Sequence, residues 1–518
     1  MTPVKTFSNA TMDEAWAAAV AEADTLRLPK HLWERPQVKG FTIDGYTSKD
    51  LDDAIWIEET ETGAIASVHI ADVAEIVQVG SAVDKVALAR TQTKYYGRGN
   101  DPMIPHTLSE NYLSLWNEKR RPTLTVQVTL DHQANMVETK IFESWLSSFW
   151  KFSYEHADIA CQKPKAPFHQ ELKLCQTWAE RLSQGREAMG AFGGLLSKSG
   201  VMFDENGNVL VSEGKLFHSQ IIIQEFMIMA NRAVAQWFAD RDVLALYRNH
   251  TARAIAPERE QLMNALLTTG NTDLIRQKLQ NWLNRAEYNP VLIGHFALNL
   301  PAYLHFTSPI RRLPDLINHR IVKAMIHGKR HPYKRFELEQ LCQYIKTVTI
   351  QEEQELREFH KERTQRRYSK QLLDTESLSK LPEKEFTNVL KHSLRDENFE
   401  PLREVALSRL NEGKLTVQDL FMLLVQSGDK SCQLAVLEAL KERVPDATSI
   451  IAMGLNQEET WDDMDFLEGS SSSPFFYWVQ VTIGGLPCTT VHPAMDGKKQ
   501  GAKQLACLAW LDPCPRYV

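Results

Sequence analysis

Four aspartates lie within ten residues near the start of the chain, at Asp44, Asp50, Asp52 and Asp53. Apolar residues flank the group on both sides, a pattern typical of two strands joined by an acidic turn. Like charges this close repel, and burial of an ionised carboxylate is costly unless the group is paired or bound to a metal. Hard oxygen ligands of this kind suit Mg²⁺ or Mn²⁺. The stretch therefore indicates a divalent-metal site or, as the alternative, an acidic surface turn solvated by water.

Two further motifs elsewhere in the chain favour the metal site over the solvated turn. The first motif, which contains the aspartates, reads T-I-D-x5-D-x-D-D-A from Thr42 to Ala54. The second begins at His69 with H-I-A-D-V and continues through G-S-A-V-D to P-M-I-P and L-S. The third, H-F-T-S-P-I-R-R-L-P-D-L-I-N-H-R from His305 to Arg320, is the most specific. In this order the three motifs resemble the ribonuclease II/R (RNB-domain) family, over roughly residues 35–360.

The resemblance implies a mixed α+β catalytic domain of the RNB type. It also implies a metal-dependent 3′→5′ exoribonuclease that hydrolyses RNA to nucleoside 5′-monophosphates. Carboxylate-bound metal ions can activate water, neutralise phosphoryl oxygens and stabilise the leaving oxygen. The resemblance makes Asp44, Asp50 and Asp53 ligand candidates for Mg²⁺, with Mn²⁺ as an alternative, and Asp52 the catalytic aspartate. Since Asp52 and Asp53 would point to opposite faces of one strand, a bulge or turn is expected there.

Arg311 and Arg312 supply fixed positive charge in the third motif. A guanidinium is planar, stays ionised and can bind phosphate through two parallel hydrogen bonds. The resemblance places Arg311 against the scissile phosphate as a catalytic residue and makes Arg312 a candidate for substrate binding. For Arg312, an ion pair with Asp315 is the alternative.

An aromatic and an acidic position complete the set that the resemblance implies. Tyr95 or Tyr96 matches a family tyrosine that stacks near the terminal base, and such stacking suits an enzyme that digests RNA of any sequence. Core packing is the alternative for each tyrosine. The family also carries a glutamate in a helix near this end of the domain, which Glu352 and Glu353 fit equally well.

Composition describes a soluble globular protein. The 518 residues exceed one ordinary core, and the content is 43% hydrophobic and 24% charged. No apolar run approaches the ~20 residues of a membrane span, and the N-terminus lacks the pattern of a secretory signal. Seven cysteines are scattered without a C-x-x-C pair, which predicts reduced thiols in a cytoplasmic protein. A net charge of −7 neither indicates nor excludes a nucleic-acid partner.

The chain is expected to contain an N-terminal helix and linker (1–36), the RNB-like catalytic domain (37–370), a helical segment (371–455) and a small α/β C-terminal domain (456–518). Periodicity predicts helices over about 11–26, 81–93 and 216–240, strands over 65–73 and 124–130, and a hairpin turn at 206–207. The first 36 residues are too few for the RNA-binding barrels with which the family usually begins, so the grip on RNA outside the catalytic channel is left open.

The tail departs furthest from the family pattern, because no S1-type barrel is evident. A Gly-Ser linker over 469–473 is predicted to precede a β-rich run over 475–483. A Lys-rich helix start then resembles the second half of a double-stranded-RNA-binding domain. Its lysines, Lys498, Lys499 and Lys503, are candidates for phosphate contacts. A small capping domain with an exposed basic turn is the alternative.

These observations predict an exoribonuclease that takes the single-stranded 3′ end of RNA, and structured RNA through its tail. The protein is expected to be a monomer. The competing hypothesis is a catalytically silent RNA-binding protein on the same fold. A third is hydrolysis of DNA or of short oligonucleotides only. The presence of all four aspartates and of Arg311 favours the enzyme.

Overall fold

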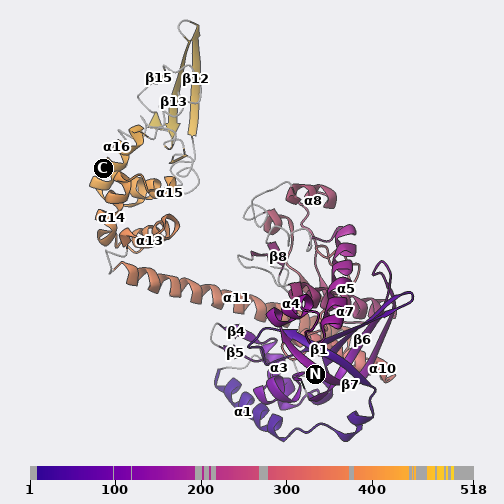
Figure 1. Ribbon diagram of the computed structural model, residues 1–518. Helices are drawn as coiled ribbons and strands as arrows, with labels where there is room; N and C mark the ends of the chain where they lie inside the picture. Colours follow the sequence, from indigo (N-terminus) through magenta and orange to yellow (C-terminus); the bar gives the residue numbers. More distant parts are fainter. Residues whose placement is uncertain are drawn as a thin grey trace. The chain divides into compact units, whose positions relative to one another are not determined.

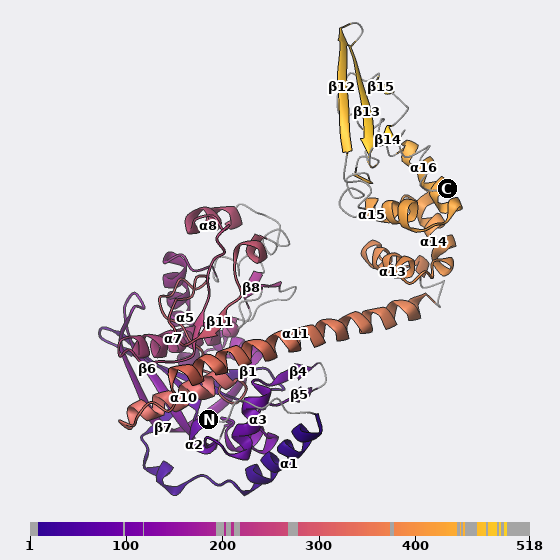
Figure 2. The same ribbon diagram turned by 180° about the vertical axis from the view of Figure 1, so that it is seen from behind.

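Figures 1 and 2 show the computed structural model from opposite sides. The structure describes residues 9–96, 99–117, 119–192, 201–203, 209–211, 218–267, 278–372, 378–442, 446, 449–450, 464–472, 475–483, 486–487 and 492–494. The chain divides into two compact units, Met1–Glu352 and Glu353–Val518. Within the described residues, no helix is long and apolar enough to cross a membrane.

A closed β-barrel lies at the centre of the first unit (Figure 1). Its strand order is β1-β2-β3-β6-β7, and the bounds are Gln37–Asp44, Asp53–Thr60, Gly63–Ala71, Arg120–Asp131 and Met136–Ser153. Neighbouring strands are antiparallel except β1 and β7, which run parallel. β1 pairs with β2 only at Phe41 and Ile55. The predicted acidic turn is the connection from β1 to β2.

Successive side chains of a strand point to opposite faces of the sheet, so each strand can bury one apolar face. In β6, Leu124, Val126 and Val128 belong to the main hydrophobic core and are fully buried. The tight turn from β2 to β3 requires glycine at Gly63, whose φ is +151° and whose absent Cβ would lie 1.9 Å from the Leu130 carbonyl oxygen. The predicted strand over 124–130 is confirmed. The strand predicted over 65–73 ends at Ala71, two residues early, because the next residue caps a helix.

Several helices of the first unit contact the barrel. α4 contacts β1 and β7, α5 contacts β2, and α7 contacts β3, β6 and β7. α1 packs on α3 (Figure 2). The bounds are Asn9–Thr25 (α1), Val73–Ile76 (α2), Ala82–Arg90 (α3), Tyr154–Gln162 (α4), His169–Ala188 (α5), His218–Ala239 (α7), Arg259–Leu267 (α8), Leu313–Ile326 (α10) and Arg335–Gln371 (α11), with short helical turns at Lys30–Glu34 (η1) and Thr107–Tyr112 (η2). The three helices predicted above are confirmed as α1, α3 and α7.

Short strand pairs complete the first unit. Their bounds are Lys94–Tyr96 (β4) with Gly99–Asp101 (β5), Val201–Phe203 (β8) with Val209–Val211 (β9), and Tyr247–Asn249 (β10) with Glu287–Asn289 (β11). β8 and β9 pair as the predicted hairpin requires, and the turn residues at 206–207 lie outside the described residues.

The second unit has its own hydrophobic core, built mainly by helices. Their bounds are Glu383–Arg395 (α13), Glu400–Asn411 (α14), Val417–Phe421 (α15), Met422–Gln426 (η3) and Lys430–Glu442 (α16). The strands β12 (Met464–Ser472), β13 (Phe475–Ile483), β14 (Leu486–Pro487) and β15 (His492–Ala494) follow. The expected helical segment and the β-rich run over 475–483 are both present.

The prediction of a Gly-Ser linker over 469–473 was wrong for the residues that the structure describes. Gly469–Ser472 belongs to β12, which pairs with β13 from Ser472↔Phe475 to Met464↔Ile483. The partner strand is rich in aromatic and β-branched residues, and its pairing overrides the weak strand propensity of glycine and serine. Lys498, Lys499 and Lys503 lie outside the described residues.

Candidate active site

The acidic connection is held at the end of the barrel by side-chain contacts. Asp44 is the last residue of β1, and its Oδ1 accepts hydrogen bonds from Gly45 N (2.6 Å) and Ser48 Oγ (2.9 Å). Ser114 Oγ accepts from Leu51 N (3.0 Å) and donates to the carbonyl of residue 49 (2.6 Å). These contacts order a turn that repulsion among its carboxylates would otherwise open.

Asp52 is the buried member of the acidic group, with 3% of its surface exposed. Its Oδ1 accepts a hydrogen bond from Ile310 N at 2.8 Å. Its Oδ2 lies 3.4 Å from Arg311 Nε and has no hydrogen-bond partner among the described residues. Burial raises the pKa of Asp52 well above its ordinary value, and Arg311 opposes that rise. A buried carboxylate with an unsatisfied oxygen is a group that a cation would stabilise.

The other aspartates lie around this buried carboxylate. Burial raises the pKa of Asp44. The charge of Arg311 lowers this pKa, and the charge of Asp50 raises it. Asp53 opens β2, is half-buried, and adds its charge to that acting on Asp52. Asp52 lies just before β2, which begins at Asp53, so the two adjacent aspartates do not belong to one continuous strand. The bulge or turn expected between them stays a prediction.

Arg311 stands on a turn before α10, and Ser308 and Asp315 organise that turn. Arg311 Nη2 donates to Ser308 Oγ at 3.0 Å. Asp315 Oδ1 accepts both from Ser308 N and from Arg312 Nη2, each at 2.8 Å. The structure thus places Arg312 in a buried ion pair with Asp315, the alternative that its sequence spacing allowed. Contact between Arg312 and substrate stays a prediction.

A second segment brings Tyr95 to the aspartates. Thr93 N donates to the Arg311 carbonyl at 2.9 Å, so the segment before β4 runs beside the arginine turn. Tyr95 OH then donates to Asp50 Oδ2 at 2.5 Å. Burial raises the pKa of the hydroxyl, while 55% of the residue is exposed. Tyr96 lies in the same strand, and its side chain is outside the described part.

The structure separates the two candidate glutamates of α11. Glu352 accepts a hydrogen bond from Gln92 Nε2 at 2.7 Å, and its other oxygen lies 3.1 Å from Lys94 Nζ. It therefore anchors the segment that carries Tyr95. Glu353 instead has an ion pair of 3.7 Å with Arg357 on its own helix. The geometry therefore favours Glu352 as the position that the resemblance implies.

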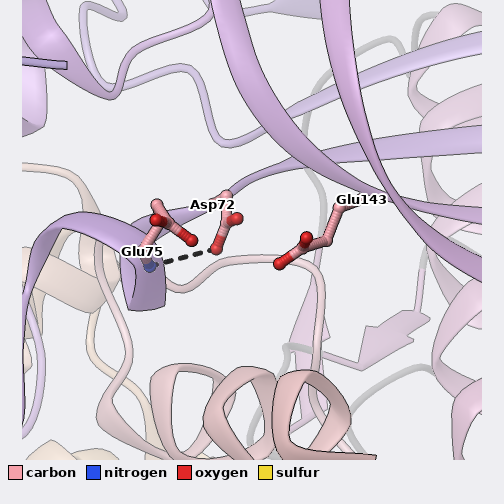
Figure 3. Close-up of side chains that lie close together, drawn as sticks. All are labelled: Asp72, Glu75 and Glu143. Carbon is pink, nitrogen blue, oxygen red and sulfur yellow. Dashed lines mark hydrogen bonds between the residues drawn. The ribbon is translucent and has the colours of Figure 1, made fainter. Parts of the chain in front are cut away.

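A separate acidic cluster must be distinguished from this site. In the described part of the chain, three potential ligand atoms lie within 4.8 Å of one another only at Asp72, Glu75 and Glu143 (Figure 3). Lys323 Nζ contacts all three carboxylates, at 2.6 Å from Asp72 and 2.7 Å from Glu75, and Arg35 contacts them as well. Protein cations already neutralise this cluster, which is why we read it as an ion network and not as a metal site.

The β1–β2 aspartates are the better metal candidates even though they do not form such a close cluster. Their donors are hard carboxylate oxygens, which suit Mg²⁺ and Mn²⁺. The unsatisfied oxygen of Asp52 and the raised pKa values of Asp44 and Asp52 mark uncompensated negative charge. The residues present therefore fit a divalent cation.

Comparison with known proteins agrees with this arrangement. The family model of the RNB domain matches residues 36–328, which is more than half of the chain. The chain belongs to the RNB-domain family. It is 32% identical to ribonuclease R of Thermotoga maritima over 343 residues, covering 59% of this chain and 47% of that protein. The chain spans about half the length of the curated relatives it matches.

Solved structures show the same RNB-domain fold. Mycoplasma genitalium RNase R, in complex with ribose-methylated single-stranded RNA, matches with a TM-score of 0.56 and 23% identity over 64% of this chain and 59% of that chain. Yeast Ssd1, a pseudonuclease, matches with a TM-score of 0.52 and 23% identity over 62% of this chain and 44% of that chain. At this identity the likeness concerns the fold.

Sequence reasoning missed the residues that support the site of this RNB-family chain. Ser48 and Ser114 fix the acidic turn, and Ser308 fixes the arginine turn. The backbone N–H of Ile310 binds Asp52 directly. Ser308 and Ile310 belong to the third motif, which could have drawn attention to them. Ser114 carries no comparable signal, because its role depends on a contact 63 positions away in the sequence.

Proposed function

We propose that this chain is a divalent-metal-dependent 3′→5′ exoribonuclease that releases nucleoside 5′-monophosphates. The observation that carries the proposal is the contact of Arg311 with the buried carboxylate of Asp52, which keeps one oxygen without a hydrogen bond. Family membership supports the reaction type, and the direction and the product rest on the resemblance.

In the proposed reaction, the chain's own groups bind and orient the scissile phosphodiester. Arg311, with 30% of its side chain exposed, is anchored by Ser308 and presents its guanidinium to the phosphoryl oxygens. Asp44, Asp50 and Asp53 would hold Mg²⁺ or Mn²⁺, which supplies an activated water and stabilises the leaving 3′ oxygen. Asp52, buried and bound to the backbone, would carry a fixed negative charge when a bound cation offsets the cost of its burial.

Tyr95 links substrate binding to the acidic group. Its hydroxyl holds Asp50, and its exposed ring is free to stack on the 3′-terminal base, whatever that base is. Glu352 fixes this segment through Gln92 and Lys94. We propose the same stacking role for Tyr96 and a phosphate-binding role for Arg312 as secondary possibilities within the site.

The tail is proposed to capture structured RNA through Lys498, Lys499 and Lys503, within a C-terminal domain of residues 456–518. The helical segment (371–455) would then lie between this domain and the catalytic domain (37–370) in the sequence. Lysines that contact phosphates contribute affinity that falls as salt concentration rises.

The likeness to a pseudonuclease fold favours one alternative, a silent RNA-binding protein. A single experiment separates the alternatives. The full chain is incubated with 5′-labelled RNA, and in parallel with DNA of the same sequence, in Mg²⁺ with and without chelator. We expect RNA to shorten from its 3′ end to nucleoside 5′-monophosphates, cleavage to stop with chelator, and Mg²⁺ or Mn²⁺ to restore it. RNA binding without cleavage would favour the catalytically silent protein. Cleavage of DNA without cleavage of RNA would show that the substrate is DNA.

A further inference from the structure

A groove with a volume of about 520 Å³ opens on the barrel, and none of the four aspartates lines it. Side chains from all five barrel strands line it. The groove includes Gln37, the first residue of β1, whereas Asp44 is the last residue of that strand. At a rise of about 3.3 Å per residue, these two positions lie roughly 23 Å apart, whereas Trp56 of the groove lies about 10 Å along β2 from Asp53. The volume is typical of pockets that bind small organic ligands.

Strand pairing explains why the groove is open. β1 pairs with β2 only at Phe41 and Ile55, so its first residues pair with β7 alone. Trp56, Ser67 and Gln127 are direct partners across β2, β3 and β6, and therefore point to the same face. The groove thus combines a fixed polar face of three strands with an edge of β1.

The groove holds an aromatic ring in a defined orientation. Trp56 Nε1 donates to Glu58 Oε1 at 2.9 Å. Lys39 Nζ lies 4.6 Å from the centre of a Trp56 ring and 3.2 Å from Glu58 Oε1. Lys39 and Glu58 are each about half exposed, so either can turn toward a ligand at little cost. Ring, cation and carboxylate are thus assembled at one place.

Amide groups beside this ring are available for recognition. Gln37 is exposed and lines the groove. Gln127 Nε2 has only a long contact of 3.5 Å with Ser67 Oγ. An amide offers two donors and a carbonyl acceptor, which can match the edge of a nucleobase. His69, by contrast, is already bonded to Thr125 Oγ1 and to the Lys39 carbonyl.

We propose that this groove binds one unstacked nucleobase with its ribose, an inference that rests on the proposed action on RNA. Trp56 offers a stacking surface for any base, and the amides of Gln37 and Gln127 face the base edge. Glu58 accepts from a ribose hydroxyl, while Lys39 turns to the adjoining phosphate. The balanced charges of Lys39 and Glu58 suit a single nucleotide better than a polyphosphate. The nucleotide belongs either to the body of an RNA strand or to a free nucleoside 5′-monophosphate.

The test measures binding in full-length protein that also carries Asp52→Asn, so that RNA stays intact. Uridine 5′-monophosphate and a long uridine strand are titrated by calorimetry into the parent, Trp56→Leu, Gln37→Ala and Trp237→Leu. Trp237 is the matched control. The guanidinium of Arg241 lies 4.5 Å from the centre of its ring, as a cation also lies over Trp56, but Trp237 belongs to α7 and does not line the groove. Loss of base stacking should weaken binding by about fivefold or more in Trp56→Leu. Gln37→Ala should weaken it less, and Trp237→Leu should match the parent.

The two ligands separate the two sources of the nucleotide. Weaker binding of the strand alone supports a subsite for the RNA body, and weaker binding of the monophosphate as well supports capture of a free nucleotide. Equal affinities of Trp56→Leu and Trp237→Leu for both ligands would overturn the proposal. The proposal would also be overturned if only Trp56→Leu lost affinity, if its melting temperature fell, and if Gln37→Ala had no effect. Such a loss of affinity would come from a damaged fold.

Failure of the groove and failure of the nuclease are distinguishable. With Asp52 intact, RNA cleavage is measured in the parent and in the matched control Trp237→Leu, and both should cleave at the same rate. If the parent protein cleaves no RNA, the proposed exoribonuclease activity is refuted. The calorimetric result still decides whether the groove binds a nucleotide.

Discussion

Replacement of Arg311 by lysine tests how the site holds phosphate. Arg311 contacts Asp52 through Nε and Ser308 through Nη2, so its fork is oriented before substrate arrives. Lysine keeps the positive charge but offers a compact ammonium that cannot make two parallel hydrogen bonds to one phosphate. Arg311→Lys therefore removes geometry while it largely preserves charge.

The size of the effect follows from one lost hydrogen bond. A hydrogen bond to a charged group contributes about 1.5–3 kcal/mol. If that bond forms in the transition state, the cleavage rate constant should fall roughly ten- to hundredfold, since each 1.36 kcal/mol is a factor of ten. Affinity for RNA should change little, because it depends mainly on total cationic charge.

Single-turnover cleavage of a short single-stranded RNA measures this rate constant directly. Arg312→Lys is the neighbouring comparison, because Arg312 is held in the buried pair with Asp315. That variant should lower the unfolding midpoint. A loss of cleavage per folded molecule would support the phosphate-binding role proposed for Arg312, and unchanged cleavage would leave Arg312 with the ion pair. An unchanged cleavage rate in Arg311→Lys would refute the placement of Arg311 on the scissile phosphate.

Three further predictions follow from other contacts. Glu352→Gln should slow single-turnover cleavage severalfold while Glu353→Gln does not, and equal rates would remove Glu352 from the site. Lys323→Met should destabilise the fold by about 3–5 kcal/mol in chemical denaturation at neutral pH, because the carboxylates lose one of the basic side chains, Lys323 and Arg35, that contact them. Burial raises the pKa values of Asp72 and Glu143, but Lys323 and Arg35 together outweigh it, and both pKa values lie below their ordinary values. Their contribution is therefore present at neutral pH and lost as pH falls through the lowered values, so the difference between the two proteins should shrink in acid; a constant difference would contradict this. Truncation just before β12 should weaken binding of a hairpin with a 3′ overhang more than binding of a short strand across a salt series, and equal affinities would make the tail a structural cap.

The sequence predicts the elements that have a local signal. α3 begins after Ser81, whose side chain accepts from Asp84 N, and α7 follows a long apolar periodicity. Closure of the barrel has no such signal, because the parallel pairing of β1 with β7 joins segments about a hundred positions apart. The Gly-Ser stretch in β12 failed for a related reason, since its strand state depends on the partner strand.

The candidate site divides in the same way. The resemblance of the motifs to the RNB family implied Asp52 and Arg311, and the structure places Arg311 Nε 3.4 Å from Asp52 Oδ2. The choice between Glu352 and Glu353 required the structure, because adjacent residues of a helix point in different directions and contact different neighbours. The pair of Arg312 with Asp315 was only one of two alternatives until the turn before α10 was seen. The domain boundaries at 36, 370 and 455, and the role of the tail lysines, stay predictions.

Cleavage by Asp52→Asn tests the central claim most directly. Asparagine keeps the volume of the buried side chain and removes its charge. Parent and variant are compared on 5′-labelled single-stranded RNA in Mg²⁺, with RNA affinity measured in parallel. The account predicts that the variant binds RNA nearly as well as the parent and does not shorten it. Cleavage by Asp52→Asn at a rate near that of the parent would contradict the assignment of this site.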